Sequence, residues 1–315
     1  CATKDEVQLM QLRDSCNDDG EAKLAETFSQ EVSVSGRTVG ILGQPWRATV
    51  TTAGDVYPWD EVEAIRWYVA ADDRWHIPSD EVAVRQRSIE GAPVLETRLR
   101  IPGGDVIQRI WVASGRQGSS ALMMEFENDS PMAIAIAIDR QDLLVSRPVA
   151  VRSSAGEWPA PGLEIPREPT VIPVGHRTIV RAALVISGST NALNIADFAE
   201  WSAVARGWVS LSERASRLTI ADLRDSQRVD ELIVAERTEI ALNPASLGDD
   251  PDAAVRWLLE ARELKRMDLQ DPDLVELSGA VETISRAVKR GRIAQANAIL
   301  GFKAAAHLLG IDQER

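Results

Sequence analysis

The spacing of apolar residues changes along the 315-residue chain, and that change constrains the fold more than any other feature. From Val32 to Ser187 apolar and polar residues alternate, and turn residues recur about every ten positions, which is typical of antiparallel strands. After Ser187 apolar residues recur at three- and four-residue steps, which indicates helices up to Arg315. The sequence therefore predicts a two-domain α+β protein, a β domain followed by an all-helical region.

A helical pattern also precedes the β region, from Asp5 to about Gln30. We therefore expect a helical arm at 1–30, an antiparallel β-sandwich at 31–190 and a domain of helical hairpins at 191–315. Eleven strands are predicted, which is too many for a small barrel and suits a large two-sheet sandwich. They are expected at 31–36, 37–43, 46–52, 62–70, 81–89, 94–101, 105–113, 121–128, 132–140, 148–153 and 177–187.

Two of these strands have informative faces. The strand at 132–140 is apolar on both faces, which predicts a central strand with protein on both sides. The strand at 94–101 places Glu96, Arg98 and Arg100 on one face, which predicts a surface exposed to water. The segment from 153 to 175 holds five prolines and is expected to be a loop between the sheets, with Trp158 as its candidate ligand residue.

The helical region carries clear start and stop signals. Asp250-Pro251 and Asp271-Pro272 each predict an aspartate cap followed by proline at the first helical position. Gly291 predicts the end of a helix, and the last helix is expected at 293–309. Short connections between these segments predict antiparallel helical hairpins.

Composition excludes several classes of partner. The formal net charge of -13 disfavours nucleic acid, and no apolar run is long enough to span a membrane. Cys1 and Cys16 are the only cysteines, so we expect reduced thiols, no disulfide framework and a soluble, acidic, cytoplasmic protein. No metal-ligand spacing, P-loop or dinucleotide fingerprint is present, so neither a metal nor a cofactor is predicted.

Acids beside aromatic residues are the remaining chemical signal. Trp59, Asp60 and Glu61 form one such group, because aromatic faces stack on sugar rings and carboxylates accept hydrogen bonds from sugar hydroxyls. Trp75 and His76 form a second group, between two predicted strands. Both groups also suit ordinary strand ends, where Trp75 would cover the open end of the sandwich.

The order of parts resembles the six-hairpin glycosidase-like enzymes of the glucoamylase and disaccharide phosphorylase type. The segments that carry the resemblance are AEWSAVARGWVSLSERASRLTIADLRDSQRVDELIVAERTEIAL and IAQANAILGFKAAAHLL. The resemblance covers 31–315 and implies an N-terminal β-supersandwich followed by part of an (α/α)6 toroid. Such a toroid has twelve helices, about five fit here, and no catalytic residue of the family can be carried over.

Two hypotheses about function follow. The first is a carbohydrate-active protein, or the non-catalytic front portion of a glycoside hydrolase-like enzyme, that binds a sugar or glycan. The second is a non-enzymatic interaction protein that presents the sandwich and the helices to a protein partner or to a second copy. Whether the chain is an enzyme stays open at this point, and continuation of the reading frame past Arg315 into further helices would favour the first hypothesis.

Overall fold

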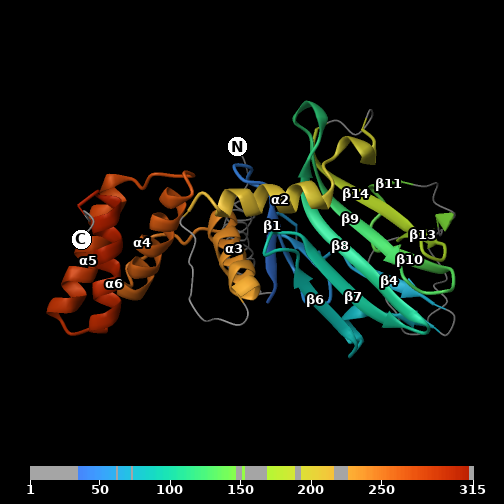
Figure 1. The fold of residues 1–315 in the computed structure, drawn as a ribbon, viewed down its shortest axis with the longest axis horizontal. Coiled ribbons are helices and arrows are strands. Elements are labelled where there is room, and N and C mark those ends of the chain that lie inside the picture. Colours follow the sequence, from blue (N-terminus) through green and yellow to red (C-terminus); the bar gives the residue numbers. More distant parts are fainter. Residues whose placement is uncertain are drawn as a thin grey trace, which may run out of the picture. The chain divides into compact units, whose positions relative to one another are not determined.

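The computed structural model describes residues 35–61, 63–71, 74–146, 151–152, 169–188, 193–215 and 226–311. The arm expected at 1–30 and Trp158 lie outside these residues. The described residues form antiparallel sheets and five α-helices, so the mixed α+β prediction is confirmed, with the helices in the C-terminal region (Figure 1).

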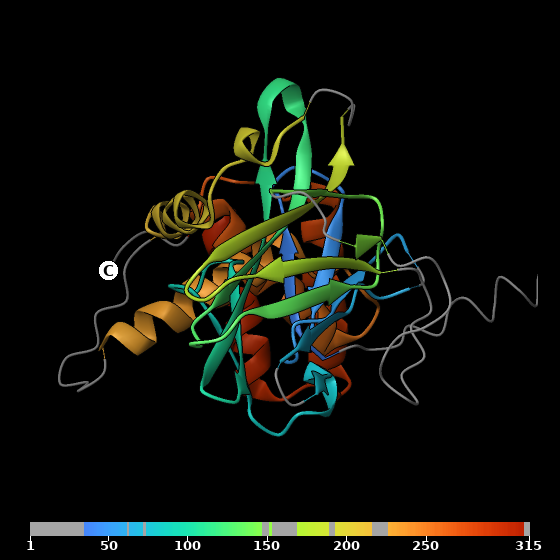
Figure 2. The same ribbon diagram turned by 90° about the vertical axis from the view of Figure 1, so that its right-hand side faces the viewer.

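The strands form three sheets, which Figure 2 shows from a second direction. The six-stranded sheet has the order β11(Leu143–Val145), β14(Ile179–Ser187), β9(Ser120–Asn128), β8(Gly104–Ser114), β7(Leu95–Ile101), β6(Val84–Ser88). The five-stranded sheet has the order β12(Val151–Arg152), β13(Thr170–Val174), β10(Ile134–Ile138), β4(Trp67–Ala70), β5(Trp75–His76). The three-stranded sheet contains β1(Arg37–Gly40), β2(Arg47–Val50) and β3(Val56–Pro58).

Alternation along the strands explains the core. Inward residues of all three sheets form one buried cluster, in which Trp67 of β4 and Phe126 of β9 lie 5.7 Å apart between ring centroids. Both rings are almost fully buried, and the Trp67 indole N–H donates to the Ala53 carbonyl at 2.9 Å. The sheets therefore pack face to face in the manner of a sandwich.

Strand β10 lies between β13 and β4, so the prediction of a central strand is confirmed. The prediction that 153–175 is a loop throughout is wrong for its last part, because β13 pairs with β10 along its length. Pro173 lies opposite Ala135 in this pair, beyond Thr170 and Val171, the positions of β13 that pair with the described residues of β12. A proline near the end of a strand is compatible with such pairing.

The helices are α2(Trp201–Ser212), α3(Ser226–Leu242), α4(Pro251–Arg266), α5(Leu274–Lys289) and α6(Gln295–Leu308). Asp250 caps α4 as predicted, accepting from the Ala253 N–H at 2.9 Å, and Gly291 ends α5 with a φ of 63°. The cap predicted at Asp271 is wrong by two residues: Asp273 accepts from the Val275 and Glu276 N–H groups. Because Asp273 offers its carboxylate directly to the first turn, the helix begins after Pro272.

Helix α3 is joined to the three-stranded sheet by side chains. Thr38 Oγ1 of β1 donates to Glu239 Oε1 at 2.5 Å, and Arg47 Nε of β2 donates to the Leu242 carbonyl at 2.8 Å. Helix α2 packs on the outer face of the six-stranded sheet, where Trp111 Nε1 donates to the Ala199 carbonyl at 2.9 Å. Among the described residues, no helix combines the length and apolar character that a membrane crossing needs.

Candidate functional site

The first predicted group follows β3. The Trp59 ring is half exposed, and its indole N–H donates to Thr49 Oγ1 at 3.0 Å, which fixes the plane of the ring. Asp60 is exposed, whereas Glu61 Oε2 lies 2.6 Å from Arg140 Nη1. Burial works to lower the pKa of Arg140, but the hydrogen bonds that it donates to Asp142 and Glu61 raise it overall. The group therefore offers one open aromatic face beside a carboxylate that is already paired.

The second predicted group lies on another sheet. Trp75 and His76 form β5, the edge strand next to β4, and His76 is buried. His76 Nδ1 lies 2.9 Å from Glu81 Oε1, and Arg74 Nη1 lies 2.6 Å from the same oxygen. The hydrogen bond from Arg74 is the largest cause of the lowered pKa of Glu81, with burial opposing it and His76 adding to it. The imidazole of His76 is thus held in place by the carboxylate of Glu81.

Sequence reasoning missed a buried pair of carboxyl groups, Asp55 before β3 and Asp139 after β10. Burial is the largest cause that raises the pKa of Asp55 to about 6, and the nearby Asp139 raises it further while Arg66 lowers it. Asp139 Oδ1 accepts from the Arg66 backbone N–H at 2.6 Å. Burial, then Asp139, raises the pKa of Tyr68 to about 12. Asp55 lies four residues before Trp59, in the same segment as the first predicted group.

Residue exposure is 6% for Asp55 and 1% for Asp139, so both are enclosed by protein. The described residues contain no group of three or more His, Cys, Asp or Glu side chains that could hold a metal ion.

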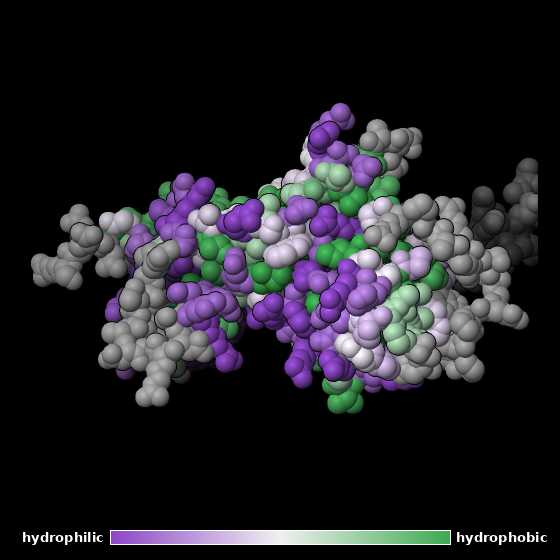
Figure 3. All heavy atoms as spheres, turned by 45° about the vertical axis from the view of Figure 1, so that its right-hand side comes forward, coloured by the Kyte–Doolittle hydropathy of each residue, from purple (hydrophilic) through white to green (hydrophobic). Residues whose placement is uncertain are grey.

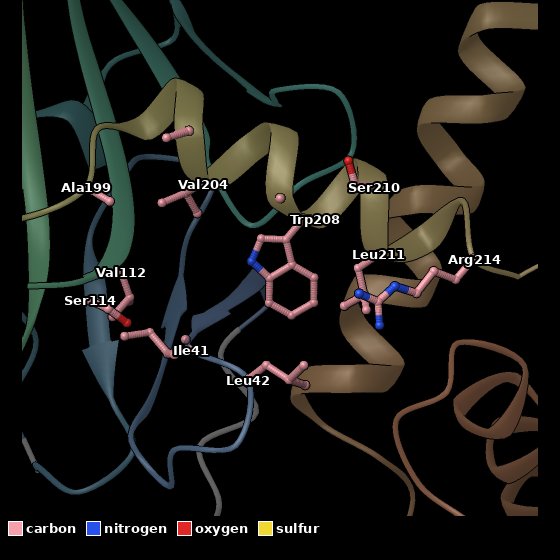
Figure 4. Close-up of a pocket in the computed structure, with 13 residues that line it drawn as sticks. Ile41, Leu42, Val112, Ser114, Ala199, Val204, Trp208, Ser210, Leu211 and Arg214 are labelled. Atoms are coloured by element: carbon pink, nitrogen blue, oxygen red, sulfur yellow. The ribbon is translucent and has the colours of Figure 1, made fainter. Parts of the chain in front are cut away.

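A pocket of about 400 Å³ lies between α2 and the sheets (Figure 4). Trp208 and Leu211 of α2 line one side, and Ile41 and Leu42, which follow β1, line another. Arg214 is the one charged residue of the lining, and its guanidinium makes no hydrogen bond or ion pair with a residue that the structure describes. The pocket can hold an apolar group near a cation, and its lining supplies no acid for catalysis.

Helix α6 distributes its side chains in an unusual way. Small residues face α4 and α5: Ala298, Ala304 and Ala305 are buried, and a Cβ atom on Gly301 would come within 2.8 Å of Ile284 Cδ1. Among the large apolar residues of α6 and its C-terminal end, Leu308 is buried, whereas the others face solvent. Exposure is 47% for Ile299, 48% for Leu300, 37% for Phe302 and 49% for Leu309.

The outward residues have the spacing of a helix-packing seam. Ile299, Phe302, Ala306 and Leu309 follow one another at steps of three, four and three residues, so they form one stripe along α6. Exposed residues of α5 add further apolar area, namely Leu274, Val275 and Val288. A surface of this kind marks a protein interaction site more often than an ordinary solvent face.

The outer face of the six-stranded sheet carries a row of charges that alternate in sign. Arg87, Glu96, Arg109, Glu125 and Arg181 stand on β6, β7, β8, β9 and β14, each opposite the next. The four contacts between neighbours measure 2.9, 3.0, 2.9 and 2.7 Å. In the space-filling view, hydrophilic residues gather in a broad area of the visible face (Figure 3).

The row corrects the expectation of a wet face on β7. The side chains of Arg98 and Arg100 are 40% and 64% exposed, as predicted, but Glu96 is 2% exposed as a residue. Burial works to raise the pKa of Glu96, but the hydrogen bond from Arg98 and the charges of Arg87 and Arg109 lower it overall. The flanking arginines both cover this carboxylate and neutralise it.

Comparison with known proteins gives no relative for this chain. No protein-family model, no curated protein and no solved structure matches it. The assignment of function therefore depends on the geometry of the chain itself.

Proposed function

We propose that the protein is a non-enzymatic interaction protein that associates with a second copy through helix α6. The observation that carries this proposal is the outward placement of Ile299, Phe302 and Leu309 at helix-seam spacing. Turning large apolar side chains to water and small ones to the core is costly for an isolated helix, because burial of each large side chain stabilises by roughly 1.5–3 kcal/mol. A second α6 lying on the stripe recovers that burial.

Charge favours a second copy in an antiparallel arrangement. Four basic residues end α5 and lead into α6: Arg286, Lys289, Arg290 and Arg292. At the opposite end of α6, Lys265 Nζ contacts the Leu308 carbonyl at 3.2 Å and Asp271 at 3.1 Å, and with Asp273 the three side chains leave one net negative charge there (+1 − 1 − 1). A two-fold axis across α6 brings the basic end of one copy to the acidic end of the other.

The length of α6 limits what it can bury alone. Fourteen residues span about 21 Å, whereas stable interfaces bury about 1,200–2,000 Å² in total. Leu274, Val275 and Val288 of α5 therefore belong to the proposed interface, which we name the α5–α6 surface.

Analytical ultracentrifugation of two single variants tests this proposal. Ile299→Glu and Phe302→Glu place a charge inside the α5–α6 surface and are expected to weaken self-association by at least about tenfold each, because central apolar contacts dominate binding. Leu232→Glu is the matched control, since Leu232 is equally exposed, at 51%, on α3. Equal weakening by the control variant, or no weakening by the two α6 variants, would contradict the proposal.

A second candidate function is favoured by one observation, the half-exposed and fixed ring of Trp59 beside Glu61 and close in sequence to Asp55. Under this proposal the chain is the cytoplasmic sugar-binding front portion of a glycoside hydrolase-like protein, with the sandwich and the helices as two domains and the hairpins as part of a toroid. Isothermal titration with maltose, trehalose and cellobiose tests it. Heat that disappears in Trp59→Ala supports sugar binding, and absence of heat for all three sugars contradicts it.

A further inference from the structure

A second charged row crosses β6 and β7, and it breaks the alternation of signs. Arg85 of β6 stands directly opposite Arg98 of β7 in the sheet register. Like charges that face each other across two strands destabilise a sheet, whereas the neighbouring row from Arg87 to Arg181 pairs opposite charges throughout. Arg85 therefore lacks the facing acid that each arginine of the neighbouring row has.

The two acids beside this pair, Glu96 and Asp105, are already engaged with other arginines. Arg98 Nε shares Glu96 Oε1, at 3.0 Å, with Arg87, while Arg100 Nη1 lies 3.0 Å from Asp105 Oδ1. The Arg85 side chain is exposed and makes no hydrogen bond or ion pair with any residue in the described part of the chain. Positive charge is thus in local excess on a chain whose net charge is -13.

A hollow of about 270 Å³ opens at this place. Its lining consists of Arg85, Arg98, Arg100, Asp105 and Ala83. The volume corresponds to roughly nine water molecules at about 30 Å³ each, which is the size of a small organic acid.

We infer that this hollow binds a small di- or tricarboxylate. The planar guanidinium group pairs with a carboxylate through two parallel hydrogen bonds, and each such fork needs its own acid group. Because Arg85 and Arg98 extend from opposite strands and Arg100 from the next outward position of β7, two or three carboxylates on one short carbon chain satisfy them together. Asp105 already accepts from part of the Arg100 guanidinium, and its negative charge repels a single compact anion of high charge.

Isothermal titration with citrate at low ionic strength tests this inference, with acetate and inorganic phosphate as comparison arms. We expect citrate to bind and Arg85→Gln to weaken that binding at least about tenfold, because a hydrogen bond to a charged group contributes about 1.5–3 kcal/mol. Arg85→Lys keeps the charge but loses the planar guanidinium group, so its affinity for citrate should lie between those of the unaltered protein and Arg85→Gln. Arg206→Gln, an exposed arginine of α2, is the control and should bind citrate as the unaltered protein does.

Thermal unfolding supplies an independent readout. Without ligand, Arg85→Gln should raise Tm, since it removes the repulsion from Arg98, and citrate should raise the Tm of the unaltered protein by more than that of this variant. The inference is overturned if citrate does not bind, if Arg85→Gln binds it unchanged, or if phosphate binds more tightly than citrate. If citrate does not bind, the remaining role of these arginines is to prevent the exposed edge strand β6 from pairing with another strand.

Discussion

Glu96 and Arg109 stand opposite one another on β7 and β8, with Arg109 Nε 3.0 Å from Glu96 Oε2 and little of either side chain open to solvent. The same guanidinium reaches Glu125 Oε1 at 2.9 Å and lies over the Trp201 ring at 5.4 Å from its centroid. Arg109 therefore neutralises two buried carboxylates and joins the sheet to α2.

Replacing Arg109 by Met should lower the free energy of unfolding by up to about 3–5 kcal/mol, because Glu96 and Glu125 then keep only the more exposed Arg87, Arg98 and Arg181 as counter-charges. Urea denaturation at neutral pH measures the change. Arg87→Met is the control: its side chain is 67% exposed, so its loss should cost no more than about 1 kcal/mol. Similar losses for both variants would show that the buried contacts of Arg109 are not the stabilising ones.

The raised pKa of Asp55 predicts that the free energy of unfolding changes with pH in the opposite direction to that caused by an acid in an ordinary ion pair. Its folded pKa, about 6, lies above the unfolded value of 3.8, so the folded state binds the proton more tightly between these values. Stability should therefore fall as pH rises from about 4 to 6 and stay reduced above that window. Asp55→Asn should remove this penalty and stabilise the protein by up to about 3 kcal/mol at pH 8.

Denaturation of Asp55→Asn and of the unaltered protein at pH 4 and pH 8 checks this account. The difference between the two proteins should be large at pH 8 and close to zero at pH 4. A difference that does not change with pH would mean that Asp55 keeps an ordinary pKa in the folded protein.

The start of α5 predicts a contrast between two aspartates. Asp273→Ala removes the side chain that accepts from two N–H groups of the first turn and should cost about 1 kcal/mol. Asp271→Ala removes only an exposed pair with Lys265 and should cost a few tenths of a kcal/mol, as surface pairs do. Chemical denaturation distinguishes them, and an equal cost would restore the cap to Asp271.

Gly207 offers a stabilising substitution. It lies in the middle of α2, and a Cβ atom placed on it would meet no other atom within 4 Å. Gly207→Ala should therefore raise the free energy of unfolding by about 0.5–1 kcal/mol through reduced backbone entropy of the unfolded chain. Gly301→Ala is the contrasting variant and should destabilise, because Ile284 Cδ1 lies 2.8 Å from the added atom. A loss of stability in Gly207→Ala would show that this part of α2 is filled by another group.

Much of the fold could be predicted because the spacing of apolar residues and the choice of turn residues depend on short stretches of sequence. The change of period after Ser187 placed the helices after the strands, and the two apolar faces of 132–138 indicated a strand at the centre of its sheet. Strand β5 and strand β13 were missed for different reasons. The first has two residues and so no measurable period, and the second lies in a proline-rich segment whose strand character depends on pairing with β10.

The site residues were harder to predict because a charged side chain is buried by segments that are distant from it in the sequence. Glu96 has the local pattern of a solvent-facing residue, and only the register with β6 and β8 brings Arg87 and Arg109 beside it, next to Arg98 of its own strand. Asp139 likewise meets Asp55 from 84 residues away in sequence (139 minus 55). The outward stripe of α6 was hidden because a helix that is apolar on all sides does not show which side faces the core.

The molar mass of the unaltered protein in solution, measured by light scattering over a range of concentrations, tests the central claim most directly. Self-association through the α5–α6 surface predicts a mass that rises toward twice that of one chain, and a weaker association at high salt because the ends of α6 carry opposite charges. A mass that stays at one chain up to high concentration would contradict the account.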